Sequence, residues 1–93
     1  MTTIADVTIP SDNWISINTE SGQPIGTQME IINKGSDTIL LQEKTTKPAV
    51  ANRDGRPLTN LQKTNYSVVT VTQGSEEIWA IALKNSSKIS IEV

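Results

Sequence analysis

Hydrophobic and polar residues alternate with a period of two along much of this chain, most clearly between residues 27 and 43. Apolar and polar side chains alternate over 28–33, and aliphatic residues resume over 38–43, as expected for β-strands. The intervening residues 33–37, Asn-Lys-Gly-Ser-Asp, are typical of tight turns. The pattern therefore predicts two strands joined as a β-hairpin, which needs further strands to cover it.

Short alternating segments separated by turn residues continue on both sides of this predicted hairpin. Residues 77–83, Glu-Ile-Trp-Ala-Ile-Ala-Leu, are apolar on both faces, as expected for a central strand or for a strand packed closely against another layer. Residues 2–9 alternate only weakly, and they predict either an edge strand or a free arm. The remaining strands are predicted over 14–18, 67–72 and 88–93.

The longest stretch without a regular pattern runs from Lys44 to Tyr66 and contains two prolines. Residues 52–56 are compatible with the tip of a short hairpin. The pattern leaves open whether residues 57–61 form a short strand or a single turn of helix. Residues 19–26 are rich in Ser, Gly and Pro, so we expect a loop that leads into the predicted hairpin.

These segments together predict an all-β fold, a small antiparallel β-sandwich or barrel of about six or seven strands with almost no helix. A length of 93 residues with 35% hydrophobic content fits one β domain over 11–93, preceded by an N-terminal arm or edge strand over 1–10. Without Phe or Cys, the core depends on aliphatic residues and has no disulfide to support it. Association with further copies or with a larger body would therefore add buried surface.

Charge and the first residues of the chain disfavour several classes of partner. The formal net charge is −2, and the one basic cluster, 53–56, carries its own acid, which disfavours nucleic acid. The N-terminal residues lack both a basic start and an apolar run. We therefore expect neither a signal peptide nor a membrane span, and synthesis in the cytoplasm.

The chain has no His and no Cys, which excludes histidine- and thiolate-based catalysis and zinc sites built on these residues. Glu76 and Glu77 are neighbours that point to opposite faces of a strand, so they do not form the facing pair of a glycosidase. Asp54 with Asp37 or Glu43 lacks the dense oxygen ligands of a calcium loop. We expect no enzyme, no catalytic residue, no cofactor and no metal.

Two tryptophans are candidates for a binding surface, because an indole offers both apolar area and a hydrogen-bond donor. Trp79 lies in the most apolar predicted strand, which favours a place in the core. Trp14 follows a polar turn, so core and surface positions both stay open. The stretch 53–56, Arg-Asp-Gly-Arg, predicts a turn closed by its own charges.

Groups of turn and core residues follow one another in a distinctive order over 14–93. They are Ser21-Gly22 with Pro24 and Gly26-Thr27, Ile31 to Gly35, Ile39 to Glu43, Asp54-Gly55 with Leu58, and Ser75 to Ala80. This order resembles that of small all-β proteins encoded by tailed bacteriophages. In those proteins a strand ending in Asn-x-Gly leads to an aliphatic strand, and a late acidic-apolar-Trp-Ala strand precedes the last one. The resemblance implies a virion component such as a head decoration protein, a head fibre base or a tail accessory.

We therefore expect a non-enzymatic structural component of a bacteriophage virion that binds a capsid or tail protein as an oligomer, for example a trimer. It would be made in the host cytoplasm without a signal peptide and kept in the virion. The residues expected at the partner interface are Ile4, Val7, Ile9, Trp14, Arg53 and Arg56. The alternative is a carbohydrate- or cell-surface-binding β module that uses Trp14 and the loop 44–66.

Overall fold

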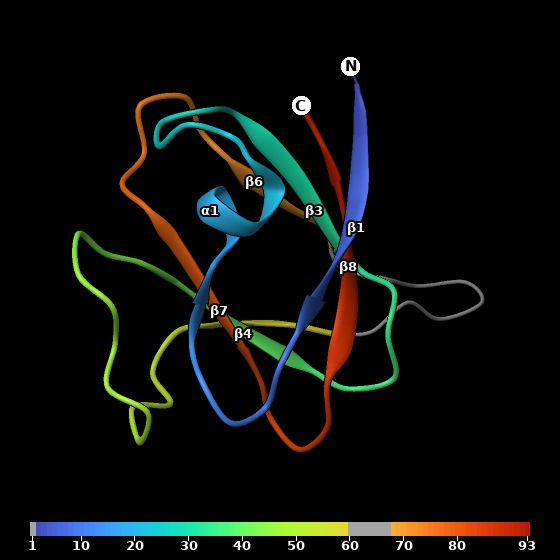
Figure 1. Ribbon diagram of the computed structural model, residues 1–93, viewed down its shortest axis with the longest axis vertical. Helices are drawn as coiled ribbons and strands as arrows, with labels where there is room; N and C mark the ends of the chain where they lie inside the picture. Colours follow the sequence, from blue (N-terminus) through green and yellow to red (C-terminus); the bar gives the residue numbers. More distant parts are fainter. Residues whose placement is uncertain (1, 60–67) are drawn as a thin grey trace.

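Two antiparallel β-sheets pack face to face in the computed structural model, which describes residues 2–59 and 68–93 (Figure 1). Sheet A has the strand order β1 (Thr3–Ile9), β8 (Ser87–Glu92), β3 (Met29–Asn33) and β6 (Val68–Val71). Sheet B has the order β2 (Ile15–Ser16), β7 (Ile78–Ala82), β4 (Ile39–Glu43) and β5 (Arg56–Leu58). The described residues also form one short helix, α1 (Ile17–Ser21). The predicted antiparallel all-β sandwich is confirmed, with eight strands in the described part of the chain.

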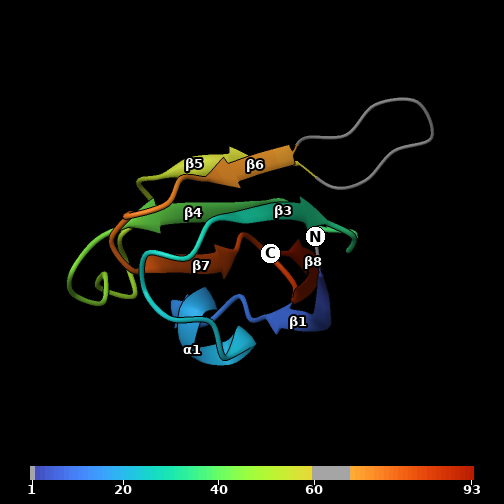
Figure 2. The same cartoon turned by 90° about the horizontal axis from the view of Figure 1, so that it is seen from above.

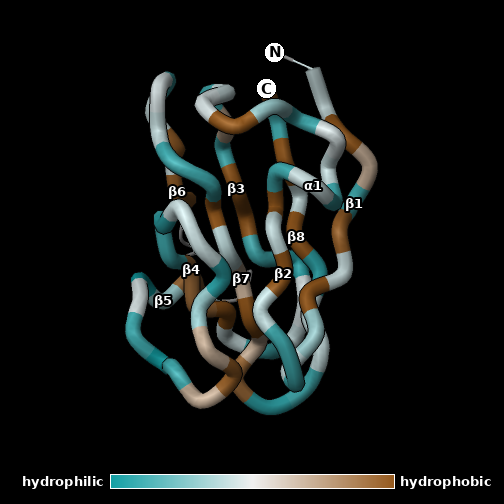
Figure 3. The backbone as a smooth tube through the Cα atoms, turned by 60° about the vertical axis from the view of Figure 1, so that its left-hand side comes forward, coloured by the Kyte–Doolittle hydropathy of each residue, from teal (hydrophilic) through white to brown (hydrophobic). Residues whose placement is uncertain are grey.

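The core lies between the two sheets and is built from the inward-facing residues of each strand. Figure 3 shows hydrophobic positions concentrated in β3, β7 and β8 and hydrophilic positions in the connecting turns. In β8, Ile89 and Ile91 are fully buried, as the alternation over 88–93 predicts. The strand over 77–83 is central, because β7 lies between β2 and β4. In β8, period-two alternation therefore identified the side chains that face the core.

The strands on either side of residues 34–38 form as predicted, but the predicted hairpin between them is wrong. Strand β3 pairs with β6 and β8 in sheet A, whereas β4 pairs with β5 and β7 in sheet B. The backbone N–H groups of Lys34 and Gly35 both donate to the carbonyl of Lys88, at 2.7 and 3.1 Å. At the other end, the N–H of Leu83 donates to the carbonyl of Thr38 at 3.0 Å. These bonds tie the connection to other strands, so it crosses between the sheets.

The side chain of Asn33, which is fully buried, holds this crossing in place. Its nitrogen donates to the carbonyls of Asp37 (2.5 Å) and Leu58 (3.0 Å). Its oxygen accepts from the N–H of Gly35 (3.0 Å) and from the hydroxyl of Ser87 (2.7 Å). An amide has two donor hydrogens and two acceptor positions, so all four are used. One side chain thus connects strands of both sheets.

Residues 14–18 were predicted as one strand, and only Ile15–Ser16 form one. Ile17–Ser21 instead form α1, because the hydroxyl of Ser16 accepts the N–H of Thr19 at 3.1 Å and caps the first turn. Gly22 ends the helix with a φ of 73°, a conformation that favours glycine. The predicted loop over 19–26 therefore begins inside a helix. The caps at both ends of Ile17–Ser21 favour a helix more strongly than the two-residue alternation favours a strand.

The outer face of sheet B is covered by residues 44–55 (Figure 1). Trp14, Leu40 and Ile81 form a second apolar cluster on this face, with Trp79 packed against it. The indole N–H of Trp14 donates to the carbonyl of Asn52 at 3.0 Å, and the whole side chain is buried. Trp14 therefore belongs to the core, which settles the alternative that the sequence left open.

Trp79 was predicted in the core and is half-buried, with its indole N–H donating to the carbonyl of Lys44 at 3.2 Å. Within the irregular stretch 44–66, Arg56–Leu58 form β5, which pairs with β4. The sequence left open whether residues 57–61 form a strand or a helical turn. They form a strand as far as Leu58, and residues 60–66 lie outside the described part of the chain.

Replacing Asn33 by Ala removes all four hydrogen bonds and leaves buried carbonyl, N–H and hydroxyl groups without this partner. We expect the free energy of unfolding to fall by about 2 to 4 kcal/mol. Urea unfolding followed by tryptophan fluorescence measures the change. The matched control is Asn85→Ala on the exposed β7–β8 turn, for which we expect a change within about 0.5 kcal/mol. Equal losses in the two variants would contradict the role given to Asn33.

Asp37 makes folding stability depend on pH. Partial burial alone would raise the pKa of its carboxyl. Hydrogen bonds from the N–H groups of Lys84, Asn85 and Thr38, together with the charge of Lys84, lower the pKa by a larger amount, so it lies below the ordinary 3.8. A carboxyl with a lowered pKa stabilises the fold above pH 3.8, and this contribution is lost as the pH falls through the folded-state pKa.

We therefore expect Asp37→Asn to be less stable than the wild-type protein at pH 7, with the difference shrinking as the pH falls to about 3. Urea unfolding at a series of pH values measures this, with the exposed Asp12→Asn as the control. A difference between Asp37→Asn and wild type that stays constant over this range would show that the ionised carboxylate is not the stabilising group.

Candidate functional site

The sandwich has two sides at which the edge strands of both sheets lie, and these two sides differ in what covers them. On one side, α1 packs against β1 and β7, and the N–H of Ala82 donates to the carbonyl of Pro10 at 2.8 Å. On the other side both sheets end, in β5 and β6, as Figure 2 shows. No described strand pairs with β5 or β6 beyond β4 and β3. We call this second side the open edge, defined by residues 56–58 and 68–71.

A cavity of about 210 Å³ lies at the open edge, between the two sheets. Its apolar wall consists of Leu41, Val69, Val71 and Ile78. Polar side chains surround it, and they are Gln42, Glu43, Arg56, Thr70, Thr72 and Ser75. Since both sheets contribute apolar residues, the cavity is an opening into the core between the two edge strands.

Strand β6 at this edge lacks the usual features that protect the edge of a sheet. In an antiparallel strand, alternate residues direct their N–H and C=O groups away from the paired neighbour. Natural sheets guard such groups with charged residues, prolines or bulges. Residues 68–71, Val-Val-Thr-Val, contain none of these, and their register with β3 is continuous.

Of the other three described edge strands, β2 is only two residues long, and the remaining two carry such protection. Strand β1 has an irregular register between Ile4 and Val7, and Asp6 lies within that irregularity. Strand β5 contains Arg56 and Pro57. The edge of β6 is therefore the one best suited to accept another strand.

Two charged groups border the cavity. Glu43 accepts the N–H of Glu76 at 3.0 Å. Arg56 is exposed and forms no ion pair with a described residue. The cavity thus combines apolar walls with one cation that no described carboxylate pairs with.

Two of the carboxylates considered for catalysis or metal binding accept hydrogen bonds that hold the fold. Glu77 accepts the hydroxyl of Ser16 at 2.5 Å, next to the start of α1. Asp37 accepts the N–H groups of Lys84 and Asn85, at 2.5 and 2.8 Å. Over residues 2–59 and 68–93, no group of three or more His, Cys, Asp and Glu residues is placed to hold a metal ion.

Several residues expected at a partner interface are buried within the domain, which corrects that expectation. Strand β1 is an edge strand hydrogen-bonded to β8, so its inward side chains fill the core. As a result Val7 is 6% exposed, Ile9 is fully buried, and Ile4 packs partly buried against the core. Trp14, which precedes β2, is fully buried in the second apolar cluster, with Leu40 and Ile81. In the isolated chain, Val7, Ile9 and Trp14 therefore lie below the surface, and Ile4 is partly exposed.

Arg53 and Arg56 are both exposed, but they do not act together. The guanidinium of Arg53 donates to the carbonyls of Val50 and Asn52 within its own loop. Arg56 instead borders the cavity at the open edge. Of the residues predicted at an interface, Arg56 is thus the one that the structure places at the candidate site.

The alternation over 67–72 predicted strand β6 but gave no indication that it forms part of a site. The available signal was the uncharged run Val68–Val71, which is unusual for a strand with a free edge. The side-chain pattern alone does not reveal which predicted strand lies at an edge, because that depends on pairing between distant segments.

Comparison of the chain with protein-family models, with curated proteins and with solved structures found no match. In the part of the chain that the structure describes, the helical segment is too short to cross a membrane.

Proposed function

We propose that this protein is a non-enzymatic structural component of a bacteriophage virion, a capsid decoration or head/tail accessory protein that binds the particle as an oligomer. The observation that carries the proposal is the open edge, where an unprotected strand adjoins a cavity leading into the core. The particle would be contacted there, through an extended segment of a capsid or tail protein.

Strand addition explains how such a contact forms. The free N–H and C=O groups of β6 pair with the backbone of the incoming segment, which supplies affinity. A side chain of that segment enters the cavity between Leu41, Val69 and Ile78, which supplies specificity. A volume of about 210 Å³ is smaller than a typical ligand pocket, so it suits a side chain better than a whole small molecule. Arg56 would favour an acidic residue next to it.

The order of turn and core residues over 14–93, similar to that of small all-β phage proteins, supports a virion role. A particle also presents the same surface many times, so contacts that are weak alone become strong when several copies bind together. A small domain whose core opens to one side gains buried apolar surface from such docking.

The alternative of a carbohydrate- or cell-surface-binding module loses its main support. It required Trp14 as a stacking surface, and Trp14 is fully buried beneath the loop that includes Asn52. We therefore do not propose a glycan ligand.

A charge on β6 tests the proposal. Thr70 is exposed and lies opposite Glu30 in the register, so Thr70→Lys creates an opposite-charge pair that preserves the fold. A lysine on an edge strand opposes strand addition, so we expect affinity for particles to fall about tenfold or more. Co-sedimentation with virions made without this gene measures binding.

The matched control is Thr8→Glu on the opposite edge strand, where Lys88 lies opposite in the register. It also creates an opposite-charge pair on sheet A, and it leaves β6 unchanged. We expect it to sediment with particles clearly better than Thr70→Lys does, because it leaves the edge strand itself unchanged. A wild-type protein that does not sediment with particles, or a Thr8→Glu loss equal to that of Thr70→Lys, would overturn the proposal.

A further inference from the structure

The outer face of sheet A has no cover among the described residues, in contrast to the outer face of sheet B. Along β3 and β8 the outward positions alternate with buried ones. Residues 30, 32 and 34 share this face with 88, 90 and 92, while Ile31, Asn33, Ile89 and Ile91 are buried. We call these six outward residues the sheet A face.

One end of the sheet A face is acidic. Glu30 and Glu92 lie directly opposite each other in the register of β3 and β8. Thr70 and Thr3 continue the row on the neighbouring strands. Like charges placed directly opposite each other repel, so this row costs stability in an isolated copy.

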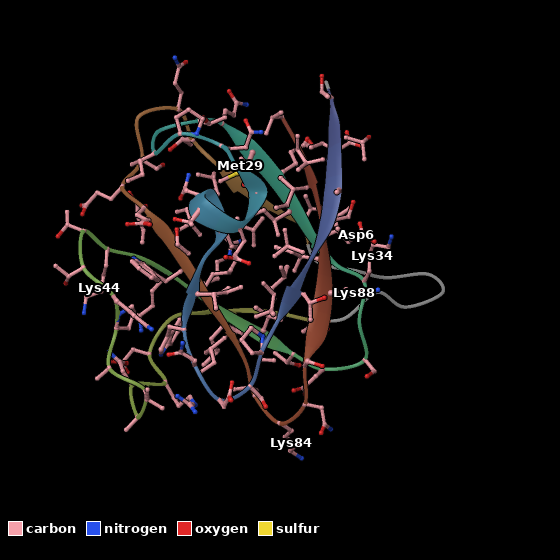
Figure 4. All side chains as sticks on the ribbon, in the orientation of Figure 1. Asp6, Met29, Lys34, Lys44, Lys84 and Lys88 are labelled. Carbon is pink, nitrogen blue, oxygen red and sulfur yellow. The ribbon has the colours of Figure 1, made fainter. Side chains whose placement is uncertain are left out.

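The other end of the face is basic. Lys34 follows β3 directly, and its N–H donates to the carbonyl of Lys88, so the two lysines are neighbours. Figure 4 shows them together with Asp6, on the side of the molecule away from Lys44. Asp6 forms an ion pair with Lys34 at 2.7 Å, and Lys88 has no ion pair with a described residue.

Between the two charged rows lies a neutral one. Ile32 lies opposite Ser90 on one side and opposite Val68 on the other. Ile32 is half-buried, and Val68 is 40% exposed. The face therefore changes from acidic through apolar to basic along the strand direction.

We propose that two copies of this chain pack their sheet A faces together around a two-fold axis that runs across the strands through Ile32 and Ser90. Position 32 is midway between 30 and 34, and position 90 is midway between 88 and 92. The rotation therefore places Glu30 over Lys34 of the second copy and Glu92 over Lys88 of the second copy. A two-fold axis parallel to the strands would instead place like charges together.

The arrangement agrees with how sheets pack. Aligned sheets lie about 10 Å apart with a small twist between them, so the central pairs overlap best. Each copy contributes the same patch, as an isologous interface requires. The acidic row gains cationic partners, and Ile32 meets its symmetry mate. Exposed ion pairs are individually weak and are screened by salt, so we expect association that weakens as salt increases.

This inference rests on the proposed function, and it specifies how two copies in the proposed oligomer are arranged. A rotation about an axis across the strands keeps β6 at the same end of both copies. The two open edges then face the same direction, toward one particle surface.

Charge reversal tests the interface. The variant Glu30→Lys/Glu92→Lys makes all four charged positions of the sheet A face basic, and Lys34→Glu/Lys88→Glu makes all four acidic, while Asp6 beside them stays unchanged. We expect the wild-type protein at low salt to have a two-copy mass by light scattering across a dilution series. Each double variant should dissociate at least about tenfold more readily, because like charges then face each other. An equimolar mixture of the two variants should regain the two-copy mass.

The variant with all four substitutions is the internal control, because it inverts the pattern and restores complementarity between copies. We expect it to form a two-copy species again, which separates loss of the interface from loss of folding. A monomeric wild-type protein, a three-copy mass, double variants that associate like wild type, or a monomeric four-fold variant would each overturn the inference.

These outcomes are separate from those that test particle binding. Thr70→Lys and Thr8→Glu each change one charge on the outer face of sheet A, so effects through self-association should be similar in both. A difference between them in particle binding therefore reports on β6. A chain that remains monomeric yet loses particle binding only in Thr70→Lys would overturn the two-fold interface and support the proposed function.

Discussion

Four hydrogen bonds to the buried side chain of Asn33 hold the point where the chain passes from sheet A to sheet B. The crossing also requires Gly35, because a Cβ at that position would lie 1.9 Å from the hydroxyl oxygen of Ser87. Since β3 and β4 are kept in different sheets, each needs other neighbours. Strand β3 pairs with β6, and β4 pairs with β5. Both β5 and β6 are the last described strands of their sheets on the same side of the sandwich, and together they form the open edge.

The surfaces that we propose for binding follow from what this arrangement leaves uncovered. Helix α1 closes one side of the sandwich, and residues 44–55 with Trp14 cover the outer face of sheet B. The open edge and the sheet A face are left uncovered by residues 2–59 and 68–93. They lie at right angles, so one copy can pair with a second copy through the face while its edge strand meets the particle. Two edges directed at one surface would bind far more tightly than one.

Much of the secondary structure follows from short-range patterns. The strands over 77–83 and 88–93 were predicted because their side chains alternate or are uniformly apolar, and each pattern depends on neighbouring residues only. The misassignment at Ile17 has a local cause as well, since the hydroxyl of Ser16 caps α1. That signal is short and lies within an alternating segment, so the two local patterns compete and the capping bond prevails.

The amino-acid sequence by itself determined the all-β class, most strands and which of their side chains face the core, because these depend on periodicity and turn residues. Only the tertiary structure decided that residues 33–37 cross between sheets, that Trp14 is buried, and that Val68–Val71 lie at the edge of the described strands of sheet A. It also placed Glu30 opposite Glu92. Each of these depends on hydrogen bonds or packing between segments far apart in the chain, and alternation within one strand carries no information about its partner.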